Sequence, residues 1–158
     1  AAFCVLGFIS LYAVVITLLD RSLIQNINLS TGLMIFSSLI VAEIGAKQSM
    51  LTVAVFGKSI HEGLGSMVID NTTIPKYLIG LIGGGFFCGV VLGVLGIIGF
   101  IAAVFSALII LNITNRHFGG VNGDGLGTAN EVGRIIALLA IILVIKSGYG
   151  GMLIWTLL

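Results

Sequence analysis

Long apolar runs separated by short polar stretches form the main pattern of the chain. At about 1.5 Å per helical residue, a run of about 20 residues crosses a hydrocarbon core of about 30 Å. The uncharged run 77–114 is too long for one ordinary crossing, so we expect two. The turn between them is expected at 93–99, where glycine recurs, with the glycine run 83–85 as the alternative. The pattern predicts an all-α fold: a polytopic membrane helix bundle, forming one transmembrane domain of about five helices. The predicted spans are 1–19, 30–56, 77–93, 97–114 and 132–156.

The composition fits a protein whose main solvent is lipid. Hydrophobic residues make up 58% of the chain and charged residues 8%, with a mean hydropathy of +1.24, whereas soluble domains are about one quarter charged. The 23 glycines suit close contacts between membrane helices. A formal net charge of +1 provides no basic surface for phosphate backbones, so we expect no nucleic-acid partner. The lipid bilayer is the expected surrounding, and the oligomeric state, a homo-oligomer included, stays open.

Two polar stretches, 57–76 and 115–131, are predicted to be loops, the first with room for one short helix. With five crossings, both fall on the same side of the membrane. Four Lys and Arg residues lie in or beside these loops, against Arg21 alone on the opposite side. Because cytoplasmic loops retain Lys and Arg, we predict a multi-pass protein of the cell membrane whose polar loops are cytoplasmic.

The second polar stretch carries the densest set of candidate chemical groups. Its glycines let the backbone approach a ligand and point N–H groups at a phosphate, ahead of a helix N-terminus that favours anions. Asp124 and Glu131 are suited to Mg²⁺, which proteins usually bind through one or two carboxylates and substrate phosphates. The stretch lacks the Gly-Lys-Ser/Thr ending of a P-loop. Its glycines are Gly119, Gly120, Gly123, Gly125 and Gly127.

A purely structural interpretation of the same stretch stays open. A Gly-rich connector capped by Asn130, with Glu131 in the first helical turn, provides what a helix start needs. In the first loop, Lys58, His61 and Glu62 fit either an interfacial loop or contacts with an anionic ligand. The patterns alone do not decide between these interpretations.

One pair of ionisable residues lies inside a predicted span. Glu43 and Lys47 are four residues apart, the spacing and order in which a helical ion pair forms well. Either alone would cost about 2.5 to 3.5 kcal/mol at the bilayer centre, so both are expected to face the bundle interior or a wet cleft. The pair is either self-neutralising, or Lys47 lines a site for an anionic substrate.

At these residues the chain resembles a known family. The segment 119–131 resembles the C-terminal signature of cobalamin synthase, usually Gly-Gly-x-Thr-Gly-Asp-x-x-Gly-Ala-x-x-Glu, with Asn122 in place of Thr and Thr128 in place of Ala. Upstream, 62–65 matches an Arg-Glu-Gly-Leu-Gly stretch in which His61 replaces Arg. A further segment, 47–50, is similar to Arg-Trp-Ala-Met. Order and spacing agree over essentially the whole chain.

The resemblance implies a membrane transferase of cobalamin biosynthesis. Such an enzyme, adenosylcobinamide-GDP ribazoletransferase, uses Mg²⁺ and transfers the corrinoid phosphate group from adenosylcobinamide-GDP to α-ribazole or its 5′-phosphate, releasing GMP. The family's N-terminal part carries an Asp-rich motif absent here, so we expect this chain to be a C-terminal fragment of such an enzyme. Asp124, Asn122 and Glu131 are then the expected catalytic residues, with Asp124 and Glu131 as metal ligands. The expected substrate-binding residues are Lys47, Lys58, His61, Glu62, Gly119, Gly120, Gly123 and Gly127.

Two rival functions share the same predicted helices. In a small membrane transporter or channel subunit, Glu43 and Lys47 would line a pathway, and neutralising Glu43 would be more damaging than Asp124→Ala. The enzyme hypothesis predicts the reverse order. A non-catalytic membrane remnant is the third interpretation.

Overall fold

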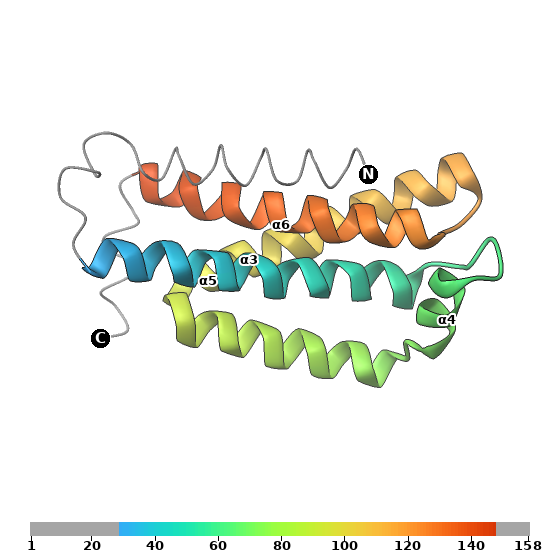
Figure 1. The fold of residues 1–158 in the computed structure, drawn as a ribbon, viewed down its shortest axis with the longest axis horizontal. Helices are drawn as coiled ribbons and strands as arrows, with labels where there is room; N and C mark the ends of the chain where they lie inside the picture. Colours follow the sequence, from blue (N-terminus) through green and yellow to red (C-terminus); the bar gives the residue numbers. More distant parts are fainter. Residues whose placement is uncertain (1–28, 148–158) are drawn as a thin grey trace.

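The computed structural model describes residues 29–147, and in that part of the chain the named elements are all helices (Figure 1). Three of them are long and apolar enough to cross a membrane, which confirms the predicted all-α membrane bundle. The predicted span 1–19 and the part of the last span beyond residue 147 lie outside the described residues. The helices are α3 (Leu29–Phe56), α4 (Leu64–Asn71), α5 (Ile74–Phe118) and α6 (Gly123–Lys146).

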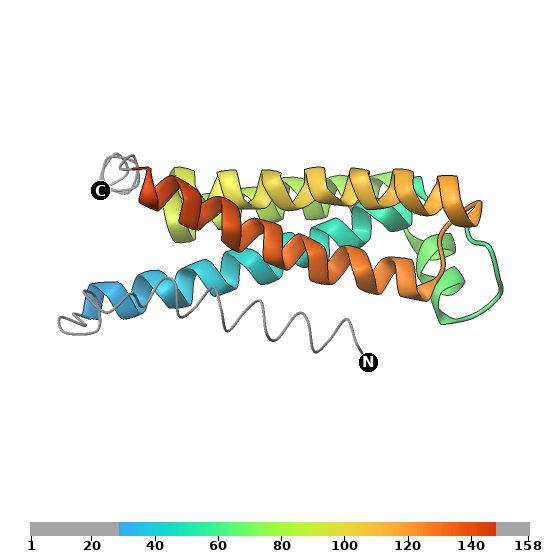
Figure 2. The same cartoon turned by 90° about the horizontal axis from the view of Figure 1, so that it is seen from above.

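Helix α5 folds back on itself, so that its two arms run side by side in opposite directions (Figures 1 and 2). The helical geometry breaks at Leu92 (φ −133°, ψ 15°) and Gly93 (φ 61°, ψ −144°). Glycine alone takes the conformation of Gly93 without steric cost. Unbroken, the 45 residues of α5 would measure about 68 Å, far more than a bilayer core. The break therefore gives two crossings, and it lies at the start of the predicted turn, 93–99.

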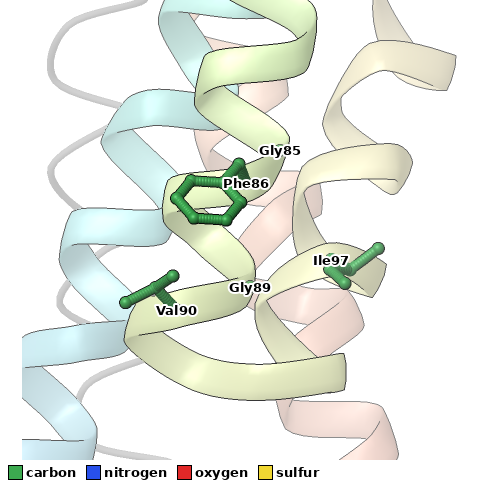
Figure 3. A pocket seen from close by; sticks show the side chains of 5 residues that line it. All are labelled: Gly85, Phe86, Gly89, Val90 and Ile97. Atoms are coloured by element: carbon green, nitrogen blue, oxygen red, sulfur yellow. The ribbon is translucent and has the colours of Figure 1, made fainter.

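Near the fold-back, glycine allows the two arms of α5 to touch. Gly96 faces the carbonyl oxygen of Cys88 with no room for a Cβ, and Gly89 lies beside the Ile97 side chain. An open groove of about 460 Å³ runs along this contact (Figure 3). It contains none of the predicted site residues. Its lining residues are Gly85, Phe86, Gly89, Val90 and Ile97.

Small residues also bring α3, α5 and α6 together in the middle of the bundle. The Ser49 hydroxyl, fully buried on α3, lies 2.8 Å from the carbonyl oxygen of Ala103 on α5. It also touches Gly133 on α6, where a Cβ would collide with it. Large apolar side chains such as Phe86 and Phe105 point outward instead, as expected for helices that are solvated by lipid.

The two predicted polar stretches meet at one end of the bundle, which we call the rim: the connectors 57–63, 72–73 and 119–122, helix α4 and the first turn of α6 (Figure 1). The Val121 N–H donates to the Lys58 carbonyl oxygen at 2.7 Å, and the Ile60 N–H donates to the Val121 carbonyl oxygen at 3.2 Å. These bonds form a short parallel bridge between Ser59 and Val121. The two stretches therefore lie on the same side of the bundle.

The sequence predicted a loop over residues 115–131. This prediction is wrong, because most of the segment is helical. Helix α5 continues to Phe118, and α6 begins at Gly123 rather than at Glu131. The residue that caps α6 is Asn122, whose side-chain oxygen accepts the Gly125 N–H at 2.9 Å, so the expected cap at Asn130 is wrong. The glycines do not prevent the helix, since Gly125 is buried and its packing outweighs its low helix propensity.

Candidate functional site

The connector between α5 and α6 owes its shape to two of the predicted glycines. Gly119 ends α5 in the left-handed conformation (φ 73°), which favours glycine. Gly120 is buried against the first polar stretch, where a Cβ would lie 2.5 Å from the Lys58 carbonyl oxygen. Gly123, the first residue of α6, faces the backbone of Gly65 at the start of α4. The glycines thus fasten the two polar stretches together at the rim.

Asp124 stands at the rim in the first turn of α6 and is exposed. Its carboxylate makes no hydrogen bond or ion pair with the described residues, whereas its backbone carbonyl accepts the Thr128 hydroxyl at 2.8 Å. The spacing of Asp124, Gly127, Thr128 and Glu131 puts them on one face of the helix. A Cβ at Gly127 would meet nothing within 4 Å, so this face is open to a ligand.

Below the rim, five polar side chains form one connected cluster, the seam cluster, across the contact of α3 with α6. Its centre is Arg134, which donates from Nε to Glu43 Oε2 at 2.8 Å and from Nη2 to Glu43 Oε1 at 3.2 Å. Arg134 Nη1 also donates to Glu131 Oε2 at 2.6 Å. The cluster consists of Glu43, Lys47, Asn130, Glu131 and Arg134.

Lys47 is the most exposed cation of the seam cluster. Its ammonium lies 3.3 Å from Glu43 Oε1 and donates to Asn130 Oδ1 at 3.1 Å. Of its side chain 57% is exposed, against 21% for Arg134. An ammonium carries three donors, so Lys47 keeps one for an anionic ligand. Both sequence interpretations of this residue therefore have a basis, because Lys47 pairs with Glu43 and stays accessible.

Glu131 lies away from Asp124, about 10 Å along the axis of α6, and its carboxylate is already engaged. One oxygen accepts the Asn130 amide at 3.2 Å and the other accepts Arg134. The described residues contain no group of three or more His, Cys, Asp and Glu side chains placed to hold a metal ion. A metal at Asp124 would therefore take most of its ligands from elsewhere.

The predicted contacts of the first polar stretch lie at the rim and are exposed: Lys58, His61 and Glu62. Their link to the second stretch is through backbone hydrogen bonds, since none of the three side chains is bonded to Asp124 or to the seam cluster. The predicted site residues therefore form two separate groups, one at the rim and one in the seam cluster.

Arg134 is the residue that the sequence analysis missed as part of the site. From the sequence, Arg134 was used only as a positive charge beside a loop, in the argument for membrane orientation. The predicted start of the last helix at Glu131 placed it near the membrane surface. The signal that could have found it is the three-residue spacing from Glu131, together with the need of an intramembrane carboxylate such as Glu43 for a second cation.

Comparison with known proteins gives a consistent result. The model of the cobalamin-5-phosphate synthase family matches residues 2–142. A protein named adenosylcobinamide-GDP ribazoletransferase from Methanococcoides burtonii is 51% identical over 98% of this chain and 57% of its own length. Proteins of the same name from Methanosarcina mazei and Methanosarcina barkeri are 48% and 40% identical over 79% and 99% of this chain.

The match is partial on the side of the relatives, because the chain spans between 48% and 59% of the length of these three proteins. No solved structure matches this chain. The family model nevertheless covers most of the chain, including α3, the rim and nearly all of α6. The chain belongs to the cobalamin-5-phosphate synthase family.

Proposed function

We propose that this chain is a membrane-embedded part of an adenosylcobinamide-GDP ribazoletransferase. The reaction is transfer of the corrinoid phosphate group from adenosylcobinamide-GDP to α-ribazole or its 5′-phosphate, with release of GMP. Family membership and the shared name of the three relatives support it. The observation that carries it is the Ser59–Val121 bridge, which joins two polar stretches beside Asp124, whose exposed carboxylate pairs with none of the residues that the structure describes.

Mg²⁺ is part of the proposal, with Asp124 as its ligand in this chain. Mg²⁺ commonly takes one or two carboxylates and completes its shell with water and substrate phosphates, which suits a single exposed carboxylate at a helix start. When bound, the ion would neutralise charge that builds on the diphosphate. For Glu131, whose two oxygens accept hydrogen bonds from neighbours, we propose a positioning role instead of direct ligation.

The other site residues hold and orient the anionic part of the substrate. Backbone N–H groups at the start of α6 point toward the rim, where the helix dipole favours phosphate. Lys47 offers its spare donor beside Asn130, which lies about one helical turn from Gly127. Lys58 and His61 approach from the other polar stretch. Positioning and charge stabilisation of this kind supply most of the catalysis in phosphoryl transfer.

We further propose that the rim faces the cytoplasm. Lys58, Lys76 and Arg116 all lie at this end of the bundle, where the positive-inside rule puts them. Substrate would then reach the site from the cytoplasm, while the apolar outer surface of α3, α5 and α6 stays in lipid.

The test is Mg²⁺-dependent GMP release from adenosylcobinamide-GDP by the full-length protein in proteoliposomes with α-ribazole. We expect Asp124→Ala to lower the rate about a hundredfold, in the range seen when one preorganised charge contact is lost. Asp70→Ala is the matched control, because Asp70 is an exposed carboxylate of α4 at the same rim and has no assigned role. Equal rates for the two variants would refute the site. Absence of GMP release in the wild-type protein would favour the transporter alternative.

A further inference from the structure

The seam cluster is balanced in charge but uneven in exposure. It contains two carboxylates, Glu43 and Glu131, and two cations, Lys47 and Arg134. Arg134 satisfies both carboxylates through three hydrogen bonds and is the more buried cation. Because uncompensated charge within a membrane helix bundle is costly, removal of either cation forces the other to compensate.

One carboxylate oxygen is shared between the two cations. Glu43 Oε1 lies 3.2 Å from Arg134 Nη2 and 3.3 Å from Lys47 Nζ. With Arg134 in place, the charge of Glu43 is neutralised without Lys47. The Lys47 ammonium also donates to Asn130 on α6. Without Arg134, Lys47 would be the nearest cation to two unneutralised carboxylates, and its ammonium would be drawn to Glu43.

We propose that Arg134 is a positioning residue that keeps Lys47 available for the anionic substrate. By neutralising Glu43 and Glu131, it leaves Lys47 with a free donor beside Asn130 of α6. The inference rests on the proposed function, because it assigns the diphosphate of adenosylcobinamide-GDP as the anion that Lys47 contacts. The addition to that function is that the balance of acidic and basic side chains in the seam cluster sets the affinity for the substrate.

Steady-state kinetics of the full-length protein in proteoliposomes test this inference with four variants. Arg134→Gln should raise the KM for adenosylcobinamide-GDP about tenfold, as for the loss of one charge-assisted hydrogen bond, and change kcat less than about threefold. Glu43→Gln with Arg134→Gln should return KM to within about threefold of wild type, because the lone Lys47 then balances Glu131. Arg134→Lys keeps the charge and should stay near wild type, and Glu43→Gln alone should not raise KM.

The double variant distinguishes two possible roles of Arg134: positioning of Lys47, and attachment of α6 to α3 alone. It lacks the same interhelical bonds as Arg134→Gln, so an attachment role predicts a KM at least as high as in the single variant. That outcome would overturn the inference, as would an unchanged KM in Arg134→Gln.

A second measurement is independent of catalysis. Acetic anhydride should modify Lys47 more slowly in detergent-solubilised Arg134→Gln than in wild type, with Lys76 as the internal reference, and the rate should recover in the double variant. Lys76 is exposed and lies outside the seam cluster. If the wild-type protein releases no GMP, the proposed function fails while this measurement still decides the positioning role. An Arg134→Gln protein whose Lys47 reacts at the wild-type rate would refute that role.

Discussion

The α5 hairpin and the α3–α6 seam solve the same packing problem with different chemistry. Both bring helices into close contact through glycine, at Gly96 in the hairpin and at Gly133 in the seam. The hairpin contains no ionisable residue between Tyr77 and Thr114 except Cys88, whereas the seam holds four charged side chains in one cluster. Apolar close packing builds the scaffold, whereas across the seam ion pairs hold charged side chains of α3 and α6 together.

The largest effect is expected from closing the space at the hairpin. In Gly96→Ala the new Cβ would meet the carbonyl oxygen of Cys88, a backbone atom that cannot move without opening the hairpin. We expect a loss of about 3 kcal/mol or more in the free energy of unfolding, at the upper end of overpacking effects. Unfolding of the protein in mixed micelles, followed by circular dichroism, measures it.

Gly83→Ala is the matched control on the same helix, since a Cβ at Gly83 would meet nothing within 4 Å. Its unfolding free energy should stay within about 0.5 kcal/mol of wild type, as for substitutions away from packed contacts. Similar losses in both variants would mean that the hairpin does not depend on contact between its arms.

A smaller loss is expected at the seam, where the obstacle is a side chain. In Gly133→Ala the Cβ would collide with the Ser49 hydroxyl, which can rotate, although the Ala46 Cα at 3.4 Å limits any shift of the helix. We expect a cost of about 1 to 2 kcal/mol in the same unfolding assay. Gly127→Ala, on the same helix with open space around it, serves as the stability control. A Gly133→Ala protein as stable as Gly127→Ala would show that the seam is loosely packed.

The sequence predicted the scaffold well, because hydropathy acts over whole helices. The uncharged run 77–114 required a reversal, and glycine indicated two places for it, 93–99 and 83–85; the structure has the break at Gly93. The start of α6 was harder to predict, since Asn122 and Asn130 are both acceptable caps by residue type. The structure selects Asn122, where burial of Gly125 and Leu126 against the bundle stabilises two more helical turns.

The candidate site was only partly accessible from the sequence, for a related reason. Asp124 and the glycines around it belong to one continuous segment, so their proximity needs no knowledge of the fold. The pairing of Glu43 with Arg134 joins residues 91 positions apart and depends on how α3 crosses α6. Spacing along one helix predicted the Glu43–Lys47 pair, yet it could not reveal the stronger, bidentate partner from another helix.

The smallest effect tests how far polar contacts, as opposed to close packing, hold the seam together. Ser49→Ala removes a buried hydroxyl that can donate to the carbonyl oxygen of Gly45 or of Ala103, both at 2.9 Å or less. Helical carbonyls are bonded within their own helices, and side-chain hydrogen bonds between membrane helices average about 0.6 kcal/mol, so we expect a cost of about that size. The substitution also makes room beside Gly133, so Gly133→Ala should cost less in the Ser49→Ala background than in wild type. A double-mutant cycle in the unfolding assay measures this coupling, and strictly additive costs would show that Ser49 and Gly133 do not limit each other's space.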